Sequence, residues 1–167
     1  MSTPHWSGSK TGLHTRELWG EGPIAADQLS EYVAASWLSQ LRFGKFGEEI
    51  GFNTIEYREH ALFVIFSVER IPRGFAYSKG EEQSVASDLL EVATFGKSLA
   101  GALIISSHTH PPGCELTRSF QDGEAWSWMK TIFEANGMRL VDNLILPGSL
   151  DCAEFYSDRE SRPWLYR

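Results

Sequence analysis

Hydrophobic residues in this chain recur at two spacings, one typical of helices and one typical of strands. From Ala25 to about Phe43, apolar residues at every third or fourth position predict a helix. The same spacing predicts a second helix over residues 82–97. It also predicts a third helix, which Ser119 caps and Gly137 ends.

Short apolar runs rich in β-branched and aromatic residues lie between these helices and predict strands. The runs cover residues 60–68, 73–78, 102–106, 138–146 and 152–157. Helices that flank a mixed β-sheet indicate an α/β or α+β layer fold. Residues 1–22 are rich in Gly, Ser and Thr, and we interpret them as an N-terminal arm before a single domain over residues 23–167.

The composition is typical of one folded domain, since 167 residues with 42% hydrophobic content can bury a core. We expect a cytoplasmic protein that does not enter a membrane, because the chain has neither a run of about 20 apolar residues nor a signal-peptide pattern. Its two cysteines, Cys114 and Cys152, make no disulfide framework. The net charge of -7 argues against nucleic acid as a general partner.

The stretch SSHTHPPGCELTRSFQD, residues 106–122, holds the candidate chemistry. A strand places residues i and i+2 on one face, so the imidazoles of His108 and His110 would converge if the preceding strand continues through them. Asp122, at the start of the next helix, could supply a carboxylate as a third ligand. Three protein ligands with a fourth position left for water are typical of a catalytic zinc site, where the pKa of the water can fall to about 7.

Two simpler interpretations of the same residues stay open. A His-x-His pair is common without a function, and Ser119 with Asp122 can act only as the N-cap and first-turn acid of a helix. The residues can also be the non-catalytic remnant of a metal site. Their occurrence together, in a strand-loop-helix context, favours the metal site.

These residues resemble the motif of a known family. HTHP at 108–111, followed by a Ser-x-x-Asp pattern at 119–122, is similar to the motif of the JAMM (JAB/MPN+) zinc metalloproteases. The segments REHALFVIFSVE, LAGALIISSHTHPPG and LVDNLIL followed by FYS resemble the RadC-like branch in the same order. The resemblance covers about residues 57–160, and it implies a JAB/MPN-like, cytidine deaminase-like mixed β-sheet flanked by helices.

The resemblance also implies a role for each residue at the site. His108, His110 and Asp122 would bind one Zn²⁺ per chain, Glu59 would be the general base, and Ser119 would help to stabilise the oxyanion. Glu59 directly precedes a buried apolar strand, where partial desolvation beside a metal-bound water would tune its proton affinity. Other candidates for the base are Glu48, Glu49 and Glu56. The loop between His110 and Ser119 has eight residues, one more than the usual motif.

Amide hydrolysis is the reaction that the resemblance implies. We therefore expect a zinc peptidase or isopeptidase, similar to deubiquitinases, that processes or deconjugates a ubiquitin-like protein in a bacterial system. The extended C-terminal tail of that protein could add as a strand beside the active-site sheet. Two alternatives stay open, namely a RadC-like accessory protein linked to DNA repair or mobile elements, and a non-catalytic MPN-like scaffold.

Two further features suggest regulation or assembly. Cys114 is either a packing residue or a thiolate that could take the open zinc position. Trp6, Trp19 and Trp164 near the chain ends either pack on the domain or form an interface with a second copy or an operon-encoded partner.

Overall fold

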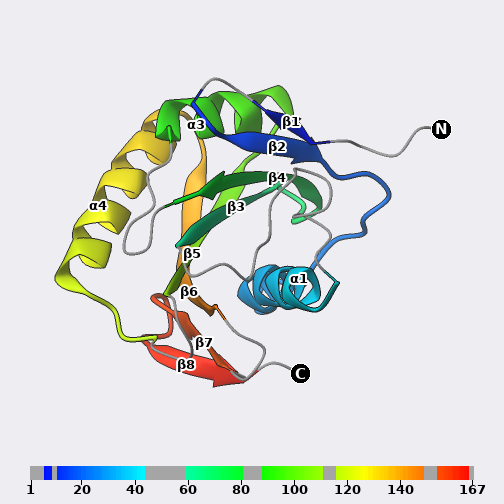
Figure 1. The fold of residues 1–167 in the computed structure, drawn as a ribbon. Coiled ribbons are helices and arrows are strands. Elements are labelled where there is room, and N and C mark those ends of the chain that lie inside the picture. The colour runs from blue at the N-terminus through cyan, green and yellow to red at the C-terminus, as the bar shows by residue number, and fades with distance from the viewer. Residues whose placement is uncertain are drawn as a thin grey trace.

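The computed structural model describes residues 6–8, 11–43, 59–80, 88–110, 116–148 and 154–165. In these residues, three helices flank one mixed sheet of eight strands (Figure 1). The helices are α1 (Leu29–Phe43), α3 (Leu89–Ser98) and α4 (Phe120–Ala135). The strands are β1 (Ser7–Gly8), β2 (His14–Glu17), β3 (His60–Phe66), β4 (Pro72–Lys79), β5 (Leu103–His110), β6 (Arg139–Pro147), β7 (Glu154–Ser157) and β8 (Arg162–Leu165).

The sheet has the order β1-β2-β4-β3-β5-β6-β7-β8. All neighbouring strands run antiparallel except β5 and β6, which are parallel and are connected through α4. This β5-α4-β6 unit places the first turn of α4 near the carboxyl end of β5. In open sheets of this kind, the ends of parallel strands are where ligands commonly bind.

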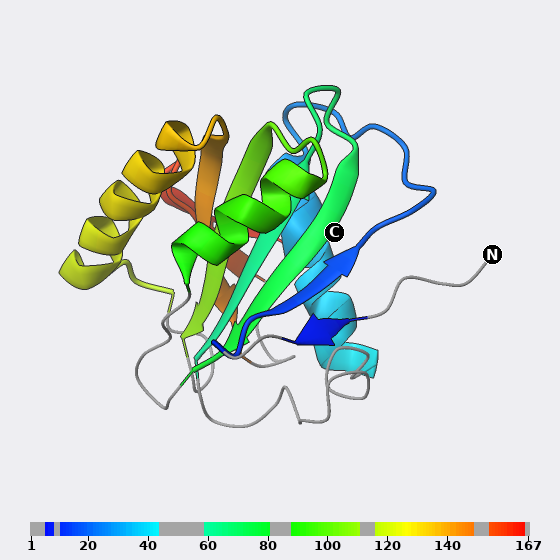
Figure 2. The ribbon, with the colours of Figure 1, turned by 90° about the horizontal axis from the view of Figure 1, so that it is seen from above.

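The helices cover both faces of the sheet (Figure 2). On one face, Val33 of α1 belongs to a core cluster with Val64 of β3. On the other face, Phe133 of α4 packs edge-on against Phe63 of β3, with ring centroids 6.0 Å apart. Strand β3 is buried along its whole length because both of its faces are covered.

The predicted mixed α/β class is confirmed, with shifts at the ends of elements. Helix α1 begins at Leu29, four residues after the predicted start, because a turn precedes it in which the Gln28 amide donates to the Ala25 carbonyl. Helix α3 begins at Leu89, since Asp88 is extended and caps it; the predicted residues 82–87 lie outside the described part. Strand β5 extends beyond residue 106 to His110.

Two segments without a predicted element contribute strands at the edges of the sheet. Part of the predicted arm forms β2, which pairs with β4, and Leu13 beside it is only 1% exposed. At the other edge, β8 pairs with β7. Trp6 packs against Phe75 and Tyr77, whereas Trp19 is 49% exposed. No helix in the described ranges is long and apolar enough to cross a membrane.

Candidate metal centre

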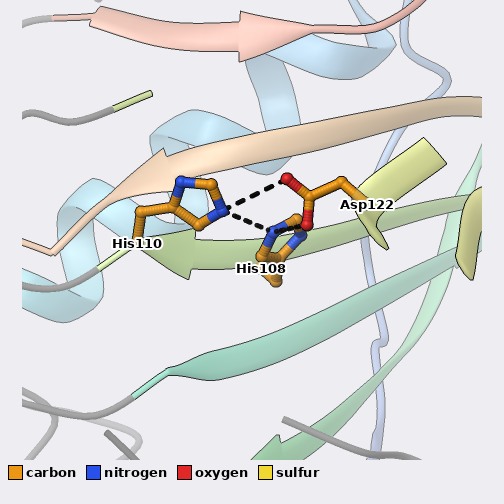
Figure 3. Close-up of side chains that lie close together, drawn as sticks. All are labelled: His108, His110 and Asp122. Carbon is orange, nitrogen blue, oxygen red and sulfur yellow. Dashed lines mark hydrogen bonds and ion pairs between the residues drawn. The ribbon is translucent and has the colours of Figure 1, made fainter. Parts of the chain in front are cut away.

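His108 and His110 lie on the same face at the end of β5, as the alternation of a strand requires (Figure 3). Their Nε2 atoms are 3.0 Å apart, and the ring centroids are separated by 4.8 Å. The predicted extension of the strand through both histidines is therefore present. It directs two imidazole nitrogens to one point.

Asp122 approaches this point from the first turn of α4. Its Oδ1 is 3.1 Å from Nε2 of His108, and its Oδ2 is 3.4 Å from Nε2 of His110. A capping box fixes the carboxylate, because the Ser119 amide donates to Oδ2 at 2.9 Å while the Asp122 amide donates to Oγ of Ser119 at 3.0 Å. The capping box of α4 therefore also holds the Asp122 carboxylate next to the two histidines.

The spacing of the three side chains suits a small divalent cation. Ligand atoms about 2.0–2.1 Å from a tetrahedral zinc are separated from each other by about 3.3–3.4 Å. The distances between the two nitrogens and the carboxylate, 3.0, 3.1 and 3.4 Å, lie close to this range. These three side chains form a group that could hold a metal ion, and each is about one-seventh exposed.

The carboxyl group of Asp122 stays ionised over a wide pH range. Burial by itself would raise its pKa, but hydrogen bonds with His108, His110 and the Ser119 amide outweigh this effect. The net result is a pKa well below the usual range of an aspartate. An ionised carboxylate beside two imidazoles is ready to bind a cation without first losing a proton.

Trp126 forms a wall of this site, a role that was not predicted from the sequence. Its ring lies 6.2 Å from the ring of His108 and stacks on Tyr156. The guanidinium of Arg118 lies over the same indole at 5.2 Å from its centroid. The signal was available, because Trp126 follows Asp122 by four positions and so occupies the same face of the helix.

Glu59 lines a pocket together with His108 and Asp122. Ala61 pairs directly with His108, and Glu59, two residues earlier in the chain, also lines the pocket next to this pair. The pocket has a volume of about 90 Å³, and its lining includes Glu59, Ala61, His108, Asp122 and Trp126. The structure therefore places the predicted base in one pocket with two of the three predicted ligands, His108 and Asp122.

Ser119 is exposed and caps α4, whereas the three predicted ligands are partly buried. Neither Ser119 nor His110 is among the residues that line the pocket. The alternative bases Glu48, Glu49 and Glu56 lie outside the described residues, as does Cys114.

A substrate tail cannot add as a strand directly to β5. Strand β3 pairs with residues 103–108 of β5 on one side, and β6 pairs with residues 103–110 on the other. Addition of a substrate tail elsewhere along the sheet, whose outer strands are β1 and β8, stays a prediction. An extended ligand would have to approach the site across the mouth of the pocket.

The chain was also compared with known proteins. No family model matches it, and no curated protein matches its sequence.

Proposed function

We propose that this protein is a zinc-dependent peptidase or isopeptidase of the JAMM type, with a RadC-like JAB domain. The observation that carries the proposal is the convergence of His108, His110 and Asp122 at the end of β5, with Glu59 in the pocket that His108 and Asp122 line. A mixed sheet covered by helices on both faces is compatible with a JAB-like fold. Two nitrogens and one carboxylate oxygen are a common donor set for catalytic zinc.

A bound zinc ion would supply Lewis acidity and a water that ionises near neutral pH. The carboxylate of Glu59 would accept the proton of the attacking water and return it to the amine that leaves. Asp122, kept ionised by its hydrogen bonds, would hold its charge beside both histidines. Ser119 would be the oxyanion donor: its Oγ accepts a hydrogen bond from the Asp122 amide, so its hydroxyl hydrogen would donate to an oxyanion that develops beside the first turn of α4, next to the pocket.

We propose the C-terminal tail of a ubiquitin-like protein as the substrate, in a bacterial system. The small volume of the pocket, about 90 Å³, favours residues with little or no side chain next to the scissile bond. The tail would cross the mouth of the pocket, because both edges of β5 are already paired.

The test is cleavage of a ubiquitin-like protein fused at its C-terminus to a short peptide, with zinc-loaded protein. Glu59→Gln should bind zinc as the wild type does and lose at least about 100-fold in rate, since general acid-base catalysis contributes that much. Glu134→Gln, an exposed change on α4, is the matched control and should keep the wild-type rate. A zinc-loaded wild type that cleaves no such fusion would favour the scaffold alternative, and full activity of Glu59→Gln would remove Glu59 as the base.

A further inference from the structure

A second and larger cavity lies on the other side of Trp126. It has a volume of about 260 Å³ and lies between α4, strand β6 and the turn that follows β7. Trp126 lines both this cavity and the pocket of the metal site. The two spaces therefore share one aromatic wall, but none of the predicted metal ligands lines the larger one.

Three cationic side chains line the larger cavity, namely Arg118, Lys130 and Arg159. This is notable in a protein whose net charge is -7. Two carboxylates also line the cavity, but Asp142 is buried and accepts hydrogen bonds from Ser30, Ser157 and the amides of Asn143 and Arg159. The charge of Asp142 is therefore already compensated by donors inside the protein.

The cations themselves are only weakly paired. Arg118 and Asp158 are 3.9 Å apart, with side chains 47% and 32% exposed. Arg159 and Glu160 are also 3.9 Å apart. Lys130 makes no ion pair with any residue in the described ranges. Exposed pairs at this distance contribute little free energy, so an incoming anion can compete with them.

The shape of the cavity follows from the sequence of α4. Gly123, Trp126, Ser127 and Lys130 follow one another at helical spacing and form one wall. A Cβ atom at Gly123 would lie 2.3 Å from Nη2 of Arg118. Because Gly123 has no side chain, the Arg118 side chain can pack against α4 at this position, and its guanidinium lies over the Trp126 ring and lines the cavity.

We propose that this cavity binds a small oxyanion, either a carboxylate or a phosphate group, through Arg118, Lys130 and Arg159. Guanidinium groups bind both kinds of oxyanion through paired N–H donors, and the lysine adds a mobile charge. The site does not depend on the proposed metallopeptidase activity, because none of the metal ligands contributes to it.

The test is calorimetric titration of the full chain with inorganic phosphate and, separately, with citrate, at constant ionic strength set by chloride. Saturable binding of phosphate alone would assign a phosphate site, binding of citrate alone a carboxylate site, and binding of both a general oxyanion site. Lys130→Gln should weaken the binding about tenfold, because one charged hydrogen bond is lost. Lys97→Gln, an exposed change on α3, is the charge-matched control and should bind as the wild type does.

Gly123→Ala tests the geometry without changing the charge. It should displace the Arg118 guanidinium and lower the affinity for the anion, while circular dichroism shows an intact helix. The His108→Ala variant should bind the anion as the wild type does, which separates this site from the metal centre. The proposal would be overturned if neither anion binds more than chloride does, or if Lys97→Gln weakens binding as much as Lys130→Gln.

Discussion

Substitutions at the capping box of α4 can separate its structural role from metal binding. Ser119→Ala removes the oxygen that accepts the Asp122 amide at 3.0 Å, and leaves the carboxylate in place. Asp122→Asn keeps an oxygen that can accept the Ser119 amide, but it removes the charge that faces His108 at 3.1 Å and His110 at 3.4 Å. We therefore expect Ser119→Ala to weaken the helix cap and keep metal binding, and Asp122→Asn to keep the cap and weaken metal binding.

The sizes of the two effects differ enough to be measured. Loss of the N-cap should cost Ser119→Ala about 1 kcal/mol, or about 2–4 °C in Tm for a chain of this length. Free zinc at about 1,000 times its Kd should stabilise the wild type by about 4 kcal/mol. Ser119→Ala should keep most of this gain. Asp122→Asn should lose at least about 2.7 kcal/mol of it, because removal of a charged ligand should weaken zinc binding by at least about 100-fold.

Thermal unfolding of metal-free protein, with and without buffered zinc, measures both effects in one experiment. The comparison uses the increase in Tm that zinc causes in each variant, so the cost of the cap cancels. The reasoning is refuted if Asp122→Asn keeps the full zinc-dependent increase. It is also refuted if Ser119→Ala loses this increase as completely as Asp122→Asn does.

Three further predictions concern the packing and the charge around the site. Asp142→Ala should lower the free energy of unfolding in urea by about 3–5 kcal/mol, since four donors lose their acceptor. Asp142→Asn, which keeps one oxygen, should cost clearly less, and equal losses would contradict this. Phe133→Ala should cost about 3–5 kcal/mol in the same assay, because the ring is fully buried against Phe63; a loss below about 1 kcal/mol would contradict it. In metal-free protein, the lowered pKa of Asp122 contributes stability that is present above about pH 4 and is lost as the pH falls below it, so acid unfolding should be less steep in Asp122→Asn than in the wild type.

Much of the site could be predicted from the sequence because it depends on local rules. His108 and His110 occupy alternate positions of one strand, and the period of a strand fixes their common face. Asp122 is placed by the capping box with Ser119, which is a pattern of four consecutive positions. Only eight residues separate His110 from Ser119 in the sequence, so the start of the helix must lie near the end of the strand.

The features that were not predicted depend on contacts between distant segments. Strand β2 has only four residues, and it is ordered by pairing with β4, about sixty positions later. The order of the strands could not be read from local patterns, and it is this order that excludes strand addition at β5. The position of Arg118 over Trp126 depends on the absence of a side chain at Gly123, which no periodicity reveals.

The central claim is that His108, His110 and Asp122 bind a metal ion, and zinc content is its most direct measurement. The protein would be stripped with a chelator, reconstituted with zinc and desalted, and its metal content would then be determined by elemental mass spectrometry. We predict about one zinc per chain in the wild type and in the control His14→Ala, and almost none in His110→Ala. A wild type that retains no zinc, or a His110→Ala variant that retains as much as the control, would contradict the account.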